Sequence, residues 1–365
     1  MNTQFSHIGH YGLFVELLQV SLGVKKELSI TPSNDEWRLL YLTATKQTLL
    51  GVVFDGIEKL PKSQQPSHEI LSRWIANVIK IEQSNRLSIT RIKELSHSCN
   101  DHELQVCLLK GQSVARLYPN PLRRQSGDID VWVRGQRNQI IQLFQSISPL
   151  KDISYHHAHC DIFNDTDVEV HFTPCWMYNP ITNYKLQSFF KNSEELQFSN
   201  RSDALSINLT LVYFDLVYSA VHIYRHLFSE GIGLRQLLDY YYIMKCSTFE
   251  QRNQAYKFLC SLGMGRFTRA MMYVLEVMFS MSKDNMYVCP DEKIGRFLLS
   301  EIMQAGNFGK FDGRIKRGKQ SLFNRFINSY KRNLKFVKYF PSEVLWAPFW
   351  KIWHFVWRKI NGYTL

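Results

Sequence analysis

Two aspartates separated by one residue are the residues of this sequence best placed to do chemistry. Asp128 and Asp130 stand in the segment Gly127-Asp128-Ile129-Asp130-Val131-Trp132-Val133, where polar and apolar residues alternate as they do in a strand. Side chains two residues apart on a strand point to the same face. The two carboxylates are therefore expected to project together, while the residues between and after them enter a core.

A second segment with the same alternation offers a third carboxylate. In residues 168–173, Glu169 and His171 share one face, and the residues between them form an apolar face. If this strand is a neighbour of the first, Glu169 joins Asp128 and Asp130 on one polar surface. Asp161, in the strand expected just before, is an alternative third carboxylate, and Glu169 is favoured.

Three close carboxylates repel one another unless a cation neutralises them. Hard oxygen ligands in that number suit Mg²⁺ or Mn²⁺ better than zinc. Such a site is what phosphoryl transfer from an NTP requires. A bare Asp-x-Asp is more often a solvated strand face. Two features favour the catalytic interpretation: Glu169 alternates with apolar residues as the aspartates do, and a Lys-Gly turn lies upstream.

A phosphate-binding turn is predicted upstream of the aspartates. Gly111 would let the backbone approach a phosphate at the start of a short helix, whose free N–H groups favour anions. Lys110 would add a positive charge and Ser113 a hydroxyl donor. Arg123 and Arg124 are both within reach of the same phosphates, and one of them is expected to be only a surface charge.

The elements that must position these residues follow from periodicity. Residues 34–100 are predicted to be helical, 104–109 and 128–133 to be strands, 138–147 a helix, and 156–163 with 168–173 a strand pair. Helices resume after residue 206, with an interruption at 231–233. The expected fold is α+β: a small mixed sheet flanked by N-terminal and C-terminal helical regions. We divide it into an N-terminal helical region (1–100), an α/β core (101–200), a helical domain closing the cleft (201–313) and a basic aromatic tail (314–365).

At this point the sequence resembles the uncharacterised nucleotidyltransferase family of the polymerase-β superfamily. The motifs that carry the resemblance occur in order: Leu109-Lys110-Gly111, Tyr118-Pro119, Arg123 or Arg124, Gly127-Asp128-Ile129-Asp130, Val168-Glu169-Val170-His171, and 231–239 (GIGLRQLLD). The resemblance covers roughly residues 35–280. It implies two metal ions held by Asp128 and Asp130, with Glu169 as the third carboxylate, and places Gly127, His171 and Arg235 at the nucleotide site. The superfamily's usual Gly-Ser turn is here Lys110-Gly111-Gln112-Ser113. The contacts of this turn with the triphosphate must therefore differ from those usual in the superfamily.

Several histidines invite other interpretations. His157, His159 and Asp161 share one strand face, but zinc ligand spacing is otherwise missing from the sequence, and an active-site wall or strand edge is the better prediction. His222 and His226 are spaced as in a zincin, yet Ile223 stands where its glutamate is needed, which excludes metalloprotease chemistry.

Two arginines of the helical half have alternative placements. Arg235 and Asp239, four residues apart, are expected to form an ion pair within their helix. The resemblance places Arg235 in the cleft instead. Arg225, with His222, faces either the cleft or solvent.

The positive charge is concentrated in the tail. The net charge is +12, and residues 314–365 hold twelve Lys and Arg against one acidic residue, Glu343. Aromatic residues are interleaved with these charges, and Pro341 and Pro348 are expected to break the tail into short helices. The tail is therefore a candidate for peripheral contact with an anionic membrane or with nucleic acid.

Composition limits the remaining classes. With 45% hydrophobic and 21% charged residues in 365, the chain is globular rather than disordered. Seven cysteines without Cys-x-x-Cys are typical of a reducing, cytoplasmic location, and the basic aromatic tail makes a position peripheral to the membrane the alternative. The predicted activity is transfer of an NMP from an NTP to an unknown acceptor. A glycosyltransferase that uses Asp-x-Asp and a nucleotide sugar, or a non-catalytic relative that binds nucleotide, are the alternatives.

Overall fold

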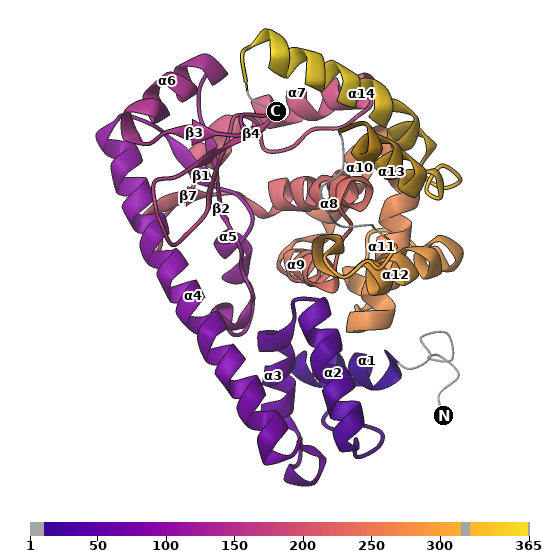
Figure 1. The fold of residues 1–365 in the computed structure, drawn as a ribbon. Coiled ribbons are helices and arrows are strands. Elements are labelled where there is room, and N and C mark those ends of the chain that lie inside the picture. Colours follow the sequence, from indigo (N-terminus) through magenta and orange to yellow (C-terminus); the bar gives the residue numbers. More distant parts are fainter. Residues whose placement is uncertain (1–10, 315–321, 364–365) are drawn as a thin grey trace.

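Helices begin and end the chain, and a mixed sheet lies between them (Figure 1). The structure is a computed structural model that describes residues 11–314 and 322–363. Of the predicted basic tail, Lys316, Arg317 and Lys319 lie outside the described residues. The predicted α+β class is confirmed.

The N-terminal part is a group of packed helices. They are α1 (Gly12–Ser21), α2 (Asn34–Lys46), α3 (Leu50–Lys59) and the long α4 (His68–Asp101). Ser33 and Glu36 form a capping box that fixes the start of α2. Helix α4 continues from this group to the sheet (Figure 1). It buries Trp74 among the N-terminal helices and Ile92 and Leu95 against the sheet.

Seven strands form one sheet within the described residues, in the order β3-β4-β5-β2-β1-β7-β6. Their bounds are β1 Val106–Leu108, β2 Ile129–Val133, β3 Leu150–Lys151, β4 His157–Cys160, β5 Val168–His171, β6 Arg201–Ser202 and β7 Ile207–Leu209. Strand β2 pairs antiparallel with β1 and parallel with β5. The predicted neighbours 128–133 and 168–173 therefore do lie side by side, and the predicted strand pair is the antiparallel pair β4–β5.

Alternation along β2 separates two environments. Ile129, Val131 and Val133 pack with α4 and with α6 (Arg137–Ile147) in one apolar cluster. On the opposite face, Trp132 contacts Phe198 of α7 (Pro180–Phe198) and stacks on Phe214 of α8 (Val212–Ser229). Asp130 shares this second face, opposite Ile129 and Val131, as the alternation predicted. The face that carries the carboxylate is also the face that meets the C-terminal helices.

The C-terminal helices pack on one another and on α1. They are α8 (Val212–Ser229), α9 (Leu234–Cys246), α10 (Phe249–Ser261), α11 (Gly265–Phe279) and α12 (Glu292–Ala305). The predicted interruption at 231–233 is the turn between α8 and α9. A short 3₁₀ turn, η6 (Asn307–Gly309), follows α12. None of the described helices combines the length and apolar content that a membrane span requires.

The tail forms two helices, α13 (Leu322–Leu334) and α14 (Pro341–Ile360). The prediction that Pro348 would end a helix was wrong, because α14 continues through it. Proline removes one backbone donor and strains one turn. Here Val344 and Ala347 are buried and Trp350 stacks on Trp176, and this packing holds the helix together across the proline.

Candidate active site

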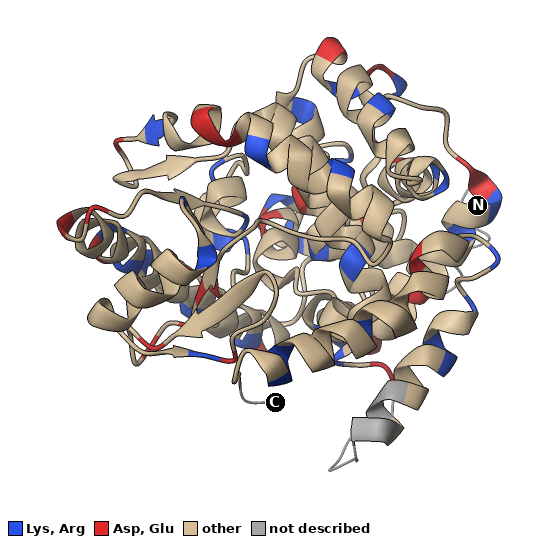
Figure 2. Ribbon diagram, turned by 90° about the horizontal axis from the view of Figure 1, so that it is seen from above, with Lys and Arg blue, Asp and Glu red and all other residues tan. Residues whose placement is uncertain are grey.

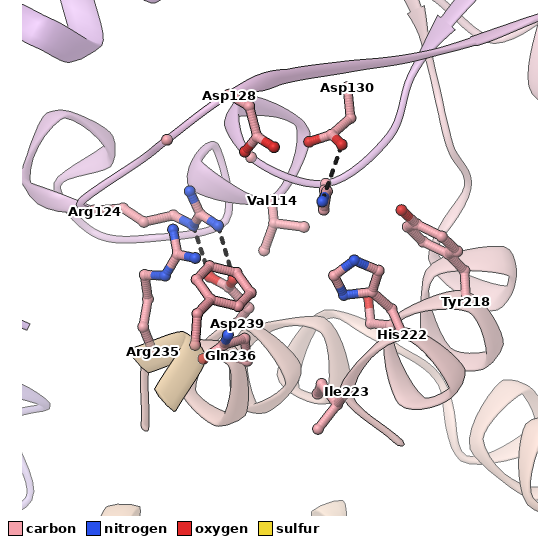
Figure 3. Close-up of a pocket in the computed structure, with 15 residues that line it drawn as sticks. Val114, Arg124, Asp128, Asp130, Tyr218, His222, Ile223, Arg235, Gln236 and Asp239 are labelled. Carbon is pink, nitrogen blue, oxygen red and sulfur yellow. Dashed lines mark hydrogen bonds and ion pairs between the residues drawn. The ribbon is translucent and has the colours of Figure 1, made fainter. Parts of the chain in front are cut away.

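Asp130 and Glu169 occupy paired positions on adjacent strands. Their Cα atoms are partners in the β2–β5 register, and Asp128 lies one residue before β2 begins. Asp130 is only 1% exposed. Figure 3 shows Asp128 and Asp130 side by side at one wall of a pocket, pointing into it. The two aspartates thus project together, as the alternation predicted.

A pocket that opens to solvent lies between the sheet and the helices α8 and α9. The sheet side is formed by β2 and by the turn that leads from β1 into α5 (Gln112–Ala115). The lining residues are Lys110, Gly111, Val114, Arg124, Gly127, Asp128, Asp130, Tyr218, Ser219, His222, Ile223, Arg235, Gln236, Asp239 and Phe308.

Positive groups converge on Asp130. The Lys110 Nζ atom lies 2.9 Å from Asp130 Oδ1, and His171 Nε2 lies 3.0 Å from the same oxygen. Burial disfavours the charged form of Lys110, but Asp130 and Asp128 outweigh it, so its pKa lies well above the usual value. Burial likewise opposes a charged His171, yet hydrogen bonds to Asp130 and Glu169 raise its pKa to about 9.

Glu169 lies beside this group and outside the pocket lining. Its Oε2 atom is 3.4 Å from His171 Nε2, so the imidazole sits between the two carboxylates. Burial would raise the pKa of Glu169, but His171 and Lys110 outweigh that effect and lower it. Glu169 is therefore held as a carboxylate.

The carboxylates fit a divalent cation. Asp130 Oδ2 is buried, can only accept, and has no hydrogen-bond partner among the described residues. Carboxylate oxygens of Asp130 and Glu169 also lie within 4.8 Å of one another. A buried carboxylate oxygen without a partner is costly, and a cation held between Asp130 and Asp128 would satisfy it.

The two neighbouring arginines have different roles. Arg124 is 3% exposed, lines the pocket and donates two hydrogen bonds to Asp239, at 2.7 and 2.8 Å. Arg123 points the other way and forms ion pairs with Asp55, Glu58 and Glu82 of α3 and α4. The structure therefore does not bring Arg123 to the pocket.

Arg235 is buried and forms no ion pair with an acidic side chain among the described residues. The predicted pair with Asp239 was wrong, because Asp239 is taken by Arg124 and by the Tyr118 hydroxyl. Arg235 donates to the carbonyl of Gln125 at 2.8 Å, and its Nε atom has no partner within the described part of the chain. Figure 3 shows Arg235 and Arg124 together on the wall next to the aspartates. An unpaired buried guanidinium is costly unless an anion joins it.

The Lys110-Gly111 turn is placed as predicted, whereas Ser113 is not. Gly111 has φ +66° and ψ −118°, a conformation that other residues rarely adopt, and it lines the pocket together with Gly127. Ser113 is fully buried outside the lining. Helix α5 has only four residues, so a strong helix-terminus effect on an anion is not expected there.

A row of polar rings leads to Glu169 from the β4 side. The Trp176 indole donates to His156 Nδ1 at 3.0 Å, and His156 Nε2 lies 2.7 Å from His157 Nδ1. Indole nitrogen can only donate, and burial keeps both histidines neutral by lowering the pKa of His156 well below its usual value and that of His157 to about 4. His156 must then carry its hydrogen on Nε2, and His157 on its own Nε2.

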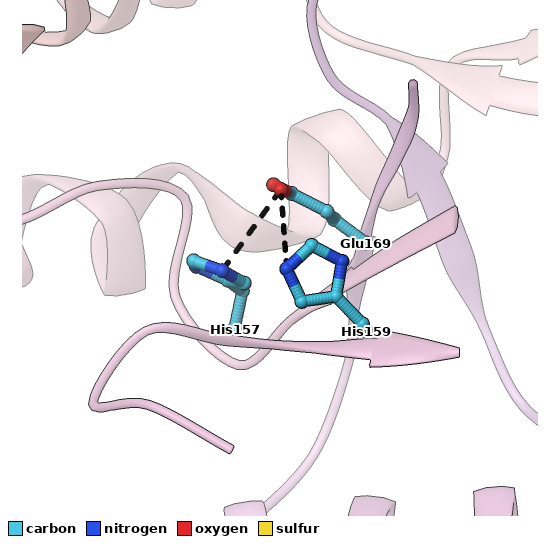
Figure 4. Close-up of side chains that lie close together, drawn as sticks. All are labelled: His157, His159 and Glu169. Carbon is cyan, nitrogen blue, oxygen red and sulfur yellow. Dashed lines mark ion pairs between the residues drawn. The ribbon is translucent and has the colours of Figure 1, made fainter. Parts of the chain in front are cut away.

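These hydrogen bonds determine whether the cluster of His157, His159 and Glu169 can bind a metal ion (Figure 4). Both histidine Nε2 atoms lie 3.9 Å from Glu169 Oε1, close enough for a metal to be considered. In the tautomer fixed by Trp176, however, His157 offers Glu169 a hydrogen and not the lone pair that a metal needs. Strand β4 lies between β3 and β5, so the histidines form a wall beside the site and not a sheet edge.

Asp161 lies apart from the pocket. It forms an ion pair with Lys151, and its side chain is 49% exposed. The structure thus places Glu169, and not Asp161, beside Asp130.

Several lining residues were missed by the sequence analysis. Tyr218, Ser219, Gln236 and Phe308 line the pocket from α8, α9 and η6, far along the chain from the aspartates. His222 faces the pocket from α8 (Figure 3). Arg225 does not; it lies over the rings of Trp176 and Tyr178 and near Glu343. A helical stripe predicts which residues share a face, but not which residue from another element meets them.

The comparisons with known proteins give one match. The model of a family described as uncharacterised nucleotidyltransferase matches residues 33–280, which is more than half of the chain. No curated protein and no solved structure matches the chain.

Proposed function

The chain belongs to the family of uncharacterised nucleotidyltransferases, and from that premise we propose that it transfers a nucleoside monophosphate from an NTP to an acceptor hydroxyl of a small molecule or a protein. Membership of this family supports nucleotidyl transfer as the general activity of the chain. The acceptor class, the use of Mg²⁺ or Mn²⁺ and the residue roles given below are our proposal.

One observation carries the proposal. Asp128 and Asp130 lie on one wall of the pocket, and Arg235, which has no acidic partner within the described part of the chain, lies on a wall beside them. A nucleoside triphosphate with its metal ions satisfies both, because its phosphates are anionic and its metal ions require carboxylates. Lys110 adds a second positive charge near the carboxylates.

The reaction assigns a task to each group. The acceptor oxygen forms a bond to the α-phosphorus, the bond between the α- and β-phosphates breaks, and pyrophosphate leaves. Glu169 accepts or orients the proton of the attacking hydroxyl, and His171 holds Glu169 and Asp130 in place. Divalent ions bound at Asp128 and Asp130 would neutralise phosphate charge and stabilise the leaving group. Lys110 and Arg235 bind and orient the phosphates.

Labelled nucleotides test this proposal. The chain is incubated with Mg²⁺, cell extract and each of ATP, GTP, CTP and UTP, labelled at either the α- or the γ-phosphate. Label from the α-phosphate should enter an acceptor, whereas label from the γ-phosphate should leave as pyrophosphate. Asp128→Asn should abolish the α-labelling. Undiminished labelling by that variant would refute the assignment.

Two other functions are separated by binding and turnover. An Asp-x-Asp glycosyltransferase would be stabilised against thermal unfolding by UDP-sugars more than by NTPs. A non-catalytic relative would bind NTP in a metal-dependent manner and label no acceptor. The intact carboxylate set and the family membership favour transfer of an NMP.

We further propose that the tail contacts an anionic membrane surface. Eight large apolar side chains of α14 are each at least 40% exposed: Leu345, Trp346, Phe349, Ile352, Trp353, Phe355, Val356 and Ile360. Most recur three or four residues apart and so form one stripe directed away from the protein body. Exposed apolar stripes of this kind mark interaction surfaces.

Charge selects the partner among the surfaces that could cover this stripe. Exposed Lys331, Lys338 and Lys359 lie on α13, on the linker and on α14. The basic residues of α14 are Lys351, Arg358 and Lys359, so its positive charge lies in the C-terminal half (Figure 2). A helix with tryptophan and aliphatic residues on one face and lysines nearby is suited to the interface of an anionic bilayer.

A further inference from the structure

Phe308 has a backbone conformation that a phenylalanine rarely adopts. It lies in η6 with φ +49° and ψ +33°, the left-handed region. A bulky residue there is strained, and such strain persists only where surrounding structure imposes it. The side chain of Phe308 lines the pocket and is only partly buried.

The glycine turn between α8 and α9 explains how η6 reaches this position. A Cβ atom on Gly233 would lie 3.0 Å from Asn307 Cα, and one on Gly231 would lie 3.3 Å from Gly309 N. Both distances are tighter than ordinary contacts, so side chains at these glycines would force the two segments apart. The Gly231-Ile232-Gly233 motif therefore lets η6 pack against the start of α9.

The ring of Phe308 lies near one guanidinium and one imidazole ring. Arg235 Cζ is 5.8 Å from its centroid, and the His226 ring is 5.0 Å away. Tyr218, the other phenyl-type ring in the lining, packs instead against the rings of Phe214 and His222. Phe308 thus offers a flat apolar surface next to a phosphate-binding arginine. No hydrogen-bonding group of its own accounts for its place in a polar pocket.

We propose that Phe308 is the platform on which the nucleobase of the NTP stacks, with Arg235 at the phosphates between the base and the carboxylates. This inference rests on the proposed function and adds the base subsite to it. Stacking on a ring tolerates any base, because every base has a π-face. The subsite therefore predicts similar affinities for ATP, GTP, CTP and UTP.

Calorimetric titration of the full chain in Mg²⁺ buffer tests the subsite, with ATP and inorganic tripolyphosphate as the two ligands. Phe308→Ala should weaken ATP binding about tenfold or more, the order expected for loss of one base stack. Binding of tripolyphosphate, which has no base, should change less than about twofold. Phe308→Trp should retain ATP affinity.

Two further variants guard the interpretation. Phe308→Asn keeps a residue that tolerates the left-handed conformation but cannot stack, so it should behave as Phe308→Ala does. Phe311→Ala is the matched control, because Phe311 is 48% exposed and lies outside the pocket lining. Equal ATP affinity in wild type, Phe308→Ala and Phe308→Asn would overturn the base platform alone. The wild-type chain could also bind tripolyphosphate at least as tightly as each of the four NTPs. In that case the platform and the NTP-dependent function both fail.

Discussion

Trp350 lies flat on Trp176, with ring centroids 3.6 Å apart and planes inclined by 10°. Trp350 belongs to α14, whereas Trp176 follows β5 and donates to His156. The pair joins the tail, which lies beyond the matched residues 33–280, to the row of rings that ends at Glu169. The tail is therefore part of the structure that holds the candidate site.

Removal of this stack should destabilise the protein. We expect Trp350→Ala to lower the free energy of unfolding by about 1 kcal/mol or more, since stacked aromatic pairs contribute on that order beyond the area they bury. Urea denaturation followed by circular dichroism measures the change. Trp346→Ala is the control, because Trp346 is 40% exposed on the same helix, and its effect should stay within about 0.5 kcal/mol. Equal effects of the two variants would contradict the role of the stack.

The identity of the third carboxylate can be tested by two variants. Glu169→Gln should reduce the rate of NMP transfer by about 100-fold or more, because several kcal/mol of transition-state stabilisation depend on such a group. Asp161→Asn should stay within about twofold of wild type, since Asp161 pairs with Lys151 away from the pocket. The measurement is initial rate under saturating NTP. A large loss in Asp161→Asn with none in Glu169→Gln would reverse the assignment.

Asp239 should be important for stability because it neutralises a buried arginine. Asp239→Asn leaves the charge of Arg124, whose side chain is 3% exposed, without a carboxylate. Loss of one partner of a buried pair costs about 3–5 kcal/mol. Asp35→Asn is the control: Asp35 pairs with Arg38 at the surface with its side chain 90% exposed, and its loss should cost less than about 1 kcal/mol. Denaturation midpoints that do not separate these variants would argue against the buried pair.

Asp215 gives the protein a predictable pH dependence. Burial raises the pKa of Asp215 to about 7 even though the Thr210 hydroxyl donates to it at 2.5 Å. In the unfolded chain the group titrates near its ordinary pKa of about 3.9. Between about pH 4 and 7 the folded state keeps a proton that the unfolded state has released, so stability falls as the pH rises.

Asp215→Asn removes this titration. The stability of wild type relative to Asp215→Asn should therefore fall from pH 4 to 7 and level off above 7. Urea denaturation of both proteins across this range provides the measurement. Curves that stay parallel from pH 4 to 8 would show that burial of Asp215 does not raise its pKa.

Vesicle flotation tests the exposed face of α14. The full chain should float with vesicles that contain about 30% phosphatidylserine and remain in the dense fraction with phosphatidylcholine alone, because lysines near the helix favour anionic lipid. Replacing Phe349, Ile352 and Val356 by serine should abolish flotation. The matched control replaces the exposed apolar residues Leu39 and Leu42 of α2 by serine. If the serine variant of α14 floats as wild type does, the membrane proposal fails. A dimer by light scattering that the α14 variant alone loses, with no flotation, would assign the face to a second copy of the chain.

The sequence predicted the parts of the site that lie close together along the strands. Alternation placed Asp128 with Asp130 and Glu169 with His171, because a strand repeats every two residues whatever surrounds it. The α+β class and the family were likewise confirmed. Arg123 and Arg124 could not be told apart. They are adjacent in a loop, and only the positions of α3, α4 and α9 decide which one meets which carboxylate.

The parts that depend on tertiary packing were missed. Phe308 reaches the pocket because two glycines about 75 residues earlier in the chain allow a close approach. Periodicity contains no such information. Helix α14 passes through Pro348 for the same kind of reason, since packing of Trp350 and Val344 outweighs the local preference of proline to end a helix.

Arg123, the last residue of the 3₁₀ turn η4 (Pro121–Arg123), and Arg124, which follows it, lie in one loop and contact different helical regions. Arg123 fastens this loop to α3 and α4, and Arg124 fastens it to α9. The backbone between them is one peptide bond, so neither helical region can detach without breaking a charged contact of the same loop. The two regions should therefore unfold cooperatively, in a single transition that includes the loop between them, and not as separate units.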